Sequence, residues 1–279
     1  MLALAVAVLC TTAFSLLIRH TQRTGQDQFA VMAVNYLSAS VIGFLMAGRA
    51  LTPSTVTWHI GLIGGVTFVL TYLVLIQSMD LKGVAIANAI TRLSVIIPML
   101  ATILIWGEHP QFIEGLGALL ALTAMPLLSL DRDGGGKRLT GKQVPLLLAL
   151  FITNGCCLLT SKWFHASGQP AERSLYFGIL FGTAAVVSVV CWLGWSRRCS
   201  WREFASGIPL GAINIATGLA VVYALDTLSG SVVFPVFAAL GLALTTGFAA
   251  WVWRESPGRL GKIGIGVALA AVVLVNLRF

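Results

Sequence analysis

Charged residues are scarce in this chain of 279 residues. Asp, Glu, Lys and Arg make up 10% of it, whereas hydrophobic residues make up 57% and the mean hydropathy is +0.90. A soluble globular protein carries roughly 25% charged residues. The apolar residues also run too continuously to be enclosed in one soluble core, so the sequence predicts an integral membrane protein.

Acidic residues are absent from the interior of the apolar stretches. Proton-coupled antiporters and carriers of cationic drugs use such a buried carboxylate, so its absence argues against a small-multidrug-type antiporter. The sequence has no Walker motif, nucleophile–base arrangement or metal-ligand spacing, and predicts neither an enzyme nor a cofactor or metal site. The net charge of +8 comes from basic residues beside the apolar stretches, which is typical of topology determinants and not of nucleic-acid binding.

What the chain has instead is ten apolar stretches, each long enough to span a bilayer. A helix needs about 17 to 25 mostly apolar residues to cross roughly 30 Å of hydrocarbon. The predicted spans are 1–18, 29–48, 55–79, 83–106, 113–130, 143–161, 174–196, 204–225, 230–252 and 261–277. They predict an all-α protein of ten transmembrane helices, with the linker 131–142 after the fifth span.

Lys and Arg are unequally divided between the two sets of connecting segments. Thirteen lie on the side of the first, third, fifth, seventh and ninth connections, and four lie on the other side with the termini. The positive-inside rule places both termini outside the cytoplasm. We therefore expect a multi-pass protein of the plasma (inner) cell membrane, embedded in the lipid bilayer, as a monomer or a homodimer.

Two 48-residue segments of the chain are related to each other. Residues 83–130 and 230–277 share 11 identities without a gap, and both contain Trp-x-Glu-x-Pro, at 106–110 and 253–257. We interpret this motif as a membrane-edge connection in which a carboxylate lies near a helix N-terminus, and a gating role for Glu108 or Glu255 is the alternative. Because the halves 1–130 and 143–279 each hold five spans, an odd number, the second must be inverted relative to the first. The sequence thus predicts two inverted five-helix repeats in one transmembrane domain.

Paired glycines extend the relation to the third and eighth spans. Gly61 and Gly65 match Gly207 and Gly211 at an offset of 146 residues. In both pairs the spacing is that of small residues which allow two membrane helices to approach closely. We expect these glycines to pack against neighbouring helices.

These features resemble the drug/metabolite transporter superfamily, in its ten-helix EamA-like branch. The resemblance rests on the five-plus-five organisation, on the glycine-containing third and eighth spans, and on two Trp-x-Glu blocks that are each followed by a glycine. These residues are Trp106-Gly107-Glu108 with Gly117, and Trp253-Arg254-Glu255 with Gly264. The resemblance implies export or exchange of small metabolites, often amino acids, through a central cavity.

Arg92 is the one charged residue deep inside a predicted span, about ten residues into the fourth. At 1.5 Å per residue it lies roughly 15 Å deep, near the middle of the bilayer. An arginine at that depth costs about 2.5–3.5 kcal/mol on insertion scales. It therefore either faces an aqueous cavity and binds a carboxylate or phosphate, or is a structural residue bonded to helix carbonyls or to an acid such as Asp80 or Asp226.

The neighbours of Arg92 complete a predicted substrate site. Asn88 lies one turn earlier on the same face, and Pro98 is expected to kink the helix just beyond Arg92. In the second repeat, Asn88 and Arg92 correspond to Pro235 and Ala239, so the halves differ where a cavity is expected. The apolar face opposite is expected from Phe234, Phe237 and Leu240. The candidate substrate-binding residues are Arg92, Asn88, Tyr72, Asn214 and Phe237.

For the isolated polar residues of the spans, a packing role is the alternative. Asn35, Asn154 and Asn214 each need a hydrogen-bond partner within the bilayer, whether or not they line a cavity. Tyr72 likewise either lines the cavity or bonds the backbone.

The leading hypothesis is a secondary transporter that moves small anionic or zwitterionic metabolites, such as amino acids, by alternating access as an exporter, facilitator or exchanger. One alternative is a flippase, in which a side-open groove handles the headgroup of a lipid-linked substrate. The other is a non-transporting membrane scaffold with a dry, packed core.

Overall fold

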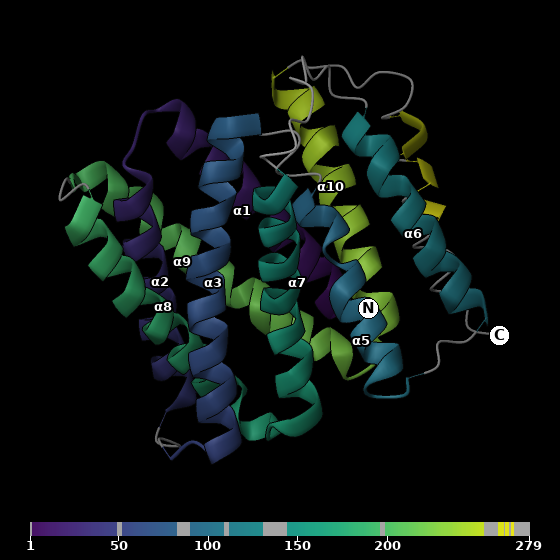
Figure 1. Cartoon of the computed structure of the whole chain (residues 1–279), viewed down its shortest axis with the longest axis horizontal. Coiled ribbons are helices and arrows are strands. Elements are labelled where there is room, and N and C mark those ends of the chain that lie inside the picture. The colour runs from purple at the N-terminus through teal and green to yellow at the C-terminus, as the bar shows by residue number, and fades with distance from the viewer. Residues whose placement is uncertain are drawn as a thin grey trace. The chain divides into compact units, whose positions relative to one another are not determined.

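Helices account for all the regular structure in the described residues. The computed structural model describes residues 2–48, 52–82, 90–108, 112–130, 144–195, 199–253, 262–264, 266–267 and 269–270. The helices, shown in Figure 1, are α1 (Leu2–Arg23), α2 (Gln28–Ala47), α3 (Thr55–Lys82), α5 (Ile96–Leu104), α6 (Phe112–Leu130), α7 (Val144–Ser167), the short 3₁₀ helix η2 (Pro170–Glu172), α8 (Arg173–Trp195), α9 (Trp201–Leu225) and α10 (Gly230–Trp253).

Eight of the ten predicted spans are continuous helices with ends close to those expected. Six of these helices are long and apolar enough to cross a membrane, judged by length and composition in the part of the chain that the structure describes. α1 and α7 continue past their apolar stretches to Arg23 and Ser167. The tenth predicted span, 261–277, lies mostly outside the described residues, and its described pieces are helical.

The chain forms two compact units, and each combines segments from both halves of the sequence. The first unit is Met1–Val69 with Thr160–Asp226, and the second is Leu70–Leu159 with Thr227–Phe279. α3 and α7 each contribute to both units. The predicted repeats, residues 1–130 and 143–279, divide the chain by similarity of sequence, whereas the two units divide it by packing. The repeats therefore stay a prediction.

Two glutamates of the first unit each join a pair of helix N-termini. The Glu203 carboxylate at the start of α9 accepts hydrogen bonds from the Ser200 N–H, at 2.8 Å, and from the N–H of Asp27, at 3.3 Å, which precedes α2. The Glu172 carboxylate before α8 accepts hydrogen bonds from the Ser54 N–H, at 3.1 Å, and from the Thr57 hydroxyl, at the start of α3. Carboxylates are stabilised there because the first N–H groups of a helix have no partner within it.

The paired glycines make the close contacts that their spacing predicts. A Cβ atom on Gly65 of α3 would lie 2.4 Å from the Leu180 carbonyl oxygen of α8. A Cβ atom on Gly211 of α9 would lie 2.4 Å from the Asn35 carbonyl oxygen of α2. Both distances are too short for a side chain, so the prediction of close helix packing is confirmed at these two glycines.

Helices α2 and α8 pack against each other in opposite directions. Phe29, at the start of α2, stacks on Trp195, at the end of α8, with ring centroids 6.0 Å apart. Toward the other end, a Cβ on Gly43 of α2 would lie 2.7 Å from the backbone nitrogen of Gly178, near the start of α8. Between these contacts, the Tyr36 and Phe181 rings stack at 6.0 Å.

The Trp-x-Glu-x-Pro motif at 106–110 supports a helix start in the second unit. The Glu108 carboxylate accepts a hydrogen bond of 2.9 Å from the N–H of Gly230, the first residue of α10. A Cβ on Gly230 would lie 2.7 Å from the Thr102 hydroxyl of α5, which explains the glycine. The prediction of a carboxylate near a helix N-terminus is confirmed for Glu108, and the helix is α10, which lies far along the sequence.

Candidate functional site

The fourth predicted span, 83–106, is broken beside Arg92. Residues 90–93 are helical, Ser94 and Val95 form a turn, and α5 begins at Ile96. Proline 98 has no N–H to donate to the carbonyl of Ser94, which accepts a bond of 3.0 Å from the Ile97 N–H instead. The kink predicted at Pro98 is therefore a break centred four residues earlier, and a single continuous helix is wrong for this span.

Asn154 of α7 fills this break. Its side-chain amide donates hydrogen bonds to the Thr91 carbonyl oxygen, at 3.0 Å, and to the Ser94 hydroxyl oxygen, at 2.5 Å. The Ser94 hydroxyl in turn donates to the Thr91 carbonyl at 2.7 Å. In an unbroken helix that carbonyl would accept from Val95, whose N–H is directed to Arg92 at 3.4 Å.

The polar groups of the break are enclosed by protein. Ser94 is fully buried. A Cβ on Gly155, the residue after Asn154, would lie 2.3 Å from the Ile97 side chain, so the glycine allows α7 to approach the start of α5. Non-helical backbone at membrane depth is tolerated where protein encloses it or where it lines a water-filled cavity. Asn154 thus makes the break compatible with the membrane.

Arg92 projects from the last helical turn before the break. Its side chain is half-buried, and among the described residues no hydrogen bond or ion pair reaches its guanidinium. An unbroken helix would place it roughly 18 Å from Leu104, the end of α5. Asn88, predicted to share its face, lies outside the described residues.

The remaining candidate residues fall in both units. Tyr72 is half-buried on the part of α3 that belongs to the second unit, and Phe237 of α10, in the same unit, is 7% exposed. Asn214 belongs to α9 in the first unit, where its amide donates to the Asn35 side-chain oxygen at 3.5 Å. The packing role that the sequence left open for Asn35 and Asn214 agrees with this pairing.

The sequence indicated only that Asn154 needs a hydrogen-bond partner, and Ser94 was not among the predicted residues. The available signal was Pro98, which deprives the carbonyl of Ser94 of its helical donor and so weakens this turn. That Asn154, 60 residues later, supplies the missing donor is a tertiary contact that no local pattern of the chain displays.

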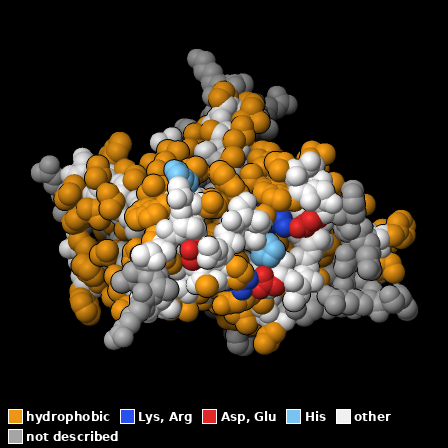
Figure 2. Space-filling view, turned by 90° about the horizontal axis from the view of Figure 1, so that it is seen from below, with side chains coloured by type: hydrophobic (Ala, Val, Ile, Leu, Met, Phe, Trp, Pro, Cys, Tyr) orange, Lys and Arg blue, Asp and Glu red, His pale blue; other side chains and the backbone are white. Residues whose placement is uncertain are grey.

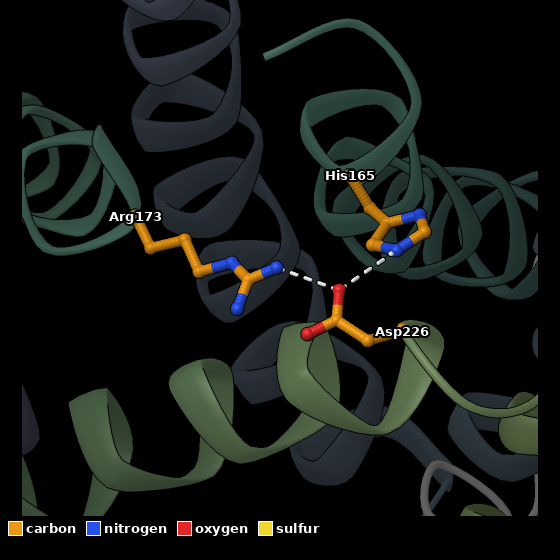
Figure 3. Close-up of polar contacts among 3 residues, drawn as sticks. All are labelled: His165, Arg173 and Asp226. Atoms are coloured by element: carbon orange, nitrogen blue, oxygen red, sulfur yellow. Dashed lines mark hydrogen bonds and ion pairs between the residues drawn. The ribbon is translucent and has the colours of Figure 1, made fainter. Parts of the chain in front are cut away.

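A second group of charged side chains lies at the ends of three helices of the first unit (Figure 3). The Asp226 carboxylate, at the end of α9, accepts from the Arg173 guanidinium at 2.6 Å and contacts His165 Nε2 at 3.2 Å. The guanidinium also lies 4.5 Å from the ring centroid of Tyr223. Asp226, offered as a structural partner of Arg92, is therefore engaged by other residues, and the side chain of Asp80 is not among those described.

The surface seen from below in Figure 2 has few charged side chains. They lie near the middle of the view among other side chains and backbone, and hydrophobic side chains cover most of the rest of the coloured surface. Exposed hydrophobic residues are also frequent on the helices, as on Leu45, Val186 and Trp201. An apolar flank of this extent is stable in lipid and would be a liability in water.

Comparison with known proteins now adds the family. Residues 1–130 match the model of the EamA-like transporter family. The match covers the first five predicted spans. The resemblance drawn from the sequence is thereby confirmed, and with the apolar helices it makes the chain a multi-pass, transporter-like membrane protein.

Two further similarities extend over nearly the whole chain. An uncharacterized protein of Haemophilus influenzae is 24% identical over 282 residues, which cover 96% of this chain and 95% of that protein. A protein of known crystal structure shares the fold with a TM-score of 0.77 at 18% identity, over 99% of this chain and 96% of that one. The similarity of fold to that structure therefore extends well past residue 130.

Replacing Asn154 tests whether it bridges the break. Asn154→Leu is expected to lower the free energy of unfolding by about 1–3 kcal/mol, because two buried hydrogen bonds are lost. The measurement is the unfolding midpoint in detergent, together with hydrogen exchange of residues 90–97, which should accelerate. Thr153→Val is the matched control, since that hydroxyl bonds only within α7, to the carbonyls of Ala149 and Leu150. Equal effects of the two variants would contradict the bridge.

Proposed function

We propose that this protein is a secondary transporter of small anionic or zwitterionic metabolites, with amino acids as the leading class, and that Arg92 binds the carboxylate or phosphate of the substrate. The observation that carries the proposal is the half-buried guanidinium of Arg92, unpaired among the described residues, beside a break in a membrane-spanning segment. The match of residues 1–130 to a family of membrane transporters supports this role.

The chemistry of the break explains why an anion suits it. A cationic group inside a membrane is costly unless it meets water or an anion. Secondary transporters commonly bind substrate where a helix is interrupted near the bilayer midplane. Arginine presents several N–H groups in a planar fork, which matches both oxygens of a carboxylate or phosphate. A bound substrate would supply the negative charge that the described residues around Arg92 do not.

An inverted repeat is the second part of the proposal, and contacts in the first unit support it. Tyr36 and Phe181 differ by 145 residues and stack on each other at 6.0 Å. Asn35 and Leu180 are separated by the same offset and make equivalent contacts. The Asn35 carbonyl oxygen packs against Gly211, and the Leu180 carbonyl oxygen packs against Gly65.

The antiparallel course of α2 and α8 bears on the direction of the repeat. Two equivalent helices that run in opposite directions are related by an axis perpendicular to them, which for membrane helices lies in the membrane plane. The two glutamates at the helix N-termini are also consistent with this relation. Glu203 joins the starts of α2 and α9, and Glu172 joins the starts of the corresponding helices α8 and α3. Such repeats allow alternating access by rocking around a fixed site. The distribution of basic residues favours an orientation with both termini outside the cytoplasm, and we propose the plasma membrane as the location.

Reconstituted protein in proteoliposomes tests the proposal. Vesicles are preloaded with one unlabelled solute and supplied with its radiolabelled form, across sets of amino acids, organic acids, sugar phosphates, nucleotides and cationic amines. We expect saturable counterflow for at least one anionic or zwitterionic solute and none for the amines. Counterflow restricted to cationic solutes, or movement of labelled lipid headgroups alone, would contradict the proposed substrate class.

A further inference from the structure

A cavity of about 440 Å³ lies in the first unit, at the junction of α1 and α9. It is lined by the last turn of α1, by the segment before α2, and by the first turns of α9. Its lining residues are His20, Thr24, Gln26, Arg202, Ala205 and Ser206. Of these, His20, Thr24 and Arg202 are exposed, while Ser206 is 8% exposed. The cavity is therefore open to the surroundings, and all of its lining residues except Ala205 have polar side chains.

Gln26, which lines this cavity, has an unpaired hydrogen-bond acceptor in its side chain. The Thr24 hydroxyl donates its one proton to the His20 carbonyl oxygen, at 2.9 Å, so its oxygen can only accept from Gln26. The Nε2 of Gln26 donates to it at 3.0 Å. This fixes the orientation of the amide and leaves Oε1 buried, with no donor among the described residues. A buried acceptor without a donor costs about 1–3 kcal/mol, so a ligand that supplies one is favoured.

Arg202 and His20 give the cavity cationic and hydrogen-bonding groups. Among the described residues no carboxylate pairs with the guanidinium of Arg202. The two acids nearby are occupied in capping helices: Asp27 accepts from the N–H groups of Phe29 and Ala30, and Glu203 accepts from Ser200. Five arginines and two acids occur in residues 19–28 and 197–203, so the surroundings are basic.

Aromatic residues place this junction at the edge of the bilayer. Trp195, the last residue of α8, is 75% exposed, and Trp201, the first residue of α9, is 80% exposed. Exposed tryptophans are enriched at the level of the lipid headgroups. Basic pockets between membrane helices on the cytoplasmic side are typical binding places for lipid headgroups.

We propose that this cavity binds the headgroup of a phospholipid, with Arg202 and His20 at the phosphodiester. Gln26 Oε1 accepts a hydrogen bond from an N–H or O–H of the alcohol esterified to that phosphate. Phosphatidylethanolamine, through its ammonium, and phosphatidylglycerol, through its hydroxyls, provide both parts. Phosphatidylcholine provides the phosphodiester but has no N–H or O–H to donate. The proposal does not depend on the transport function.

Native mass spectrometry of the detergent-solubilised full chain tests it with dioleoyl lipids that share the same acyl chains. We expect phosphatidylethanolamine and phosphatidylglycerol to bind about tenfold more tightly than phosphatidylcholine, the effect of roughly one buried hydrogen bond. Arg202→Gln should weaken all three lipids, whereas Gln26→Leu should remove only the preference over phosphatidylcholine. Gln26→Glu keeps an acceptor and should retain the preference for phosphatidylethanolamine.

Two controls separate this site from general charge effects. Arg138→Gln removes a basic residue of the linker 131–142, and His59→Ala removes an exposed histidine on α3. Neither should change lipid binding. The proposal is overturned if phosphatidylcholine binds as tightly as the other two lipids, or if Arg202→Gln and Arg138→Gln act alike. It is also overturned if millimolar inorganic phosphate displaces the lipid completely, which would identify a site for free phosphate.

Discussion

Arg92→Ala is expected to lower substrate uptake into proteoliposomes by roughly 100-fold at subsaturating concentration. Loss of a charged hydrogen-bond donor in a site of low polarity costs about 1.5–3 kcal/mol or more, and the upper value corresponds to roughly 100-fold. Arg92→Lys should retain partial uptake, because lysine keeps the charge and loses the planar fork. The measurement is the initial rate of uptake of whichever solute shows counterflow with the unaltered protein.

Thermal stability separates a substrate-binding role of Arg92 from a structural one. Because an unpaired arginine inside a membrane is unfavourable, Arg92→Ala should unfold at the same temperature as the unaltered protein or at a higher one. A structural arginine bonded to helix carbonyls would behave in the opposite way, with a lowered unfolding temperature. Unchanged uptake, or lost uptake together with a marked loss of stability, would contradict substrate binding by Arg92.

Gly65→Ala and Gly211→Ala are expected to destabilise the protein by similar amounts, about 1–3 kcal/mol each. The new Cβ would lie 2.4 Å from the Leu180 carbonyl oxygen in the first variant and 2.4 Å from the Asn35 carbonyl oxygen in the second. Backbone atoms cannot turn aside as a flexible side chain can, so the packed helices must separate. Unfolding midpoints in a denaturing detergent series measure the effect.

Gly194→Ala is the matched control for both substitutions. Gly194 lies near the end of α8, and a Cβ there would meet no atom within 4 Å. Alanine favours a helix over glycine by about 1 kcal/mol, so this variant should be neutral or slightly more stable. A large loss at only one of Gly65 and Gly211 would count against their equivalence, and with it against the inverted repeat.

Much of the architecture could be predicted because membrane helices are long, apolar and bounded by charge. α2, α6, α8 and α9 begin and end within a few residues of the expected bounds. α1 and α7 extend further, because hydrophobicity marks the portion that fits the hydrocarbon and not the end of helical hydrogen bonding. The polar residues Thr21 and Lys162 are helical in these extensions.

The candidate site was predictable only in part. Arg92 is conspicuous in the sequence, because a charge inside an apolar stretch is costly in lipid and typically marks a pathway or a binding site. The break beside Arg92 could be predicted only as a kink, because Pro98 removes a single helical hydrogen bond. The Thr91 carbonyl oxygen at the break accepts from Asn154, which belongs to a helix distant in the sequence. The position of Glu108 near a helix N-terminus was predicted, whereas the identity of that helix, α10, required the fold.

The most direct test of the central claim is a binding comparison between the transported solute and its uncharged amide analogue. Dissociation constants are measured by calorimetry for the unaltered protein and for Arg92→Gln, which keeps side-chain donors and removes the charge. If Arg92 binds the anionic group, the unaltered protein should prefer the acid by roughly 10- to 100-fold, and Arg92→Gln should bind acid and amide alike. An undiminished preference for the acid in Arg92→Gln would show that the anion is recognised elsewhere.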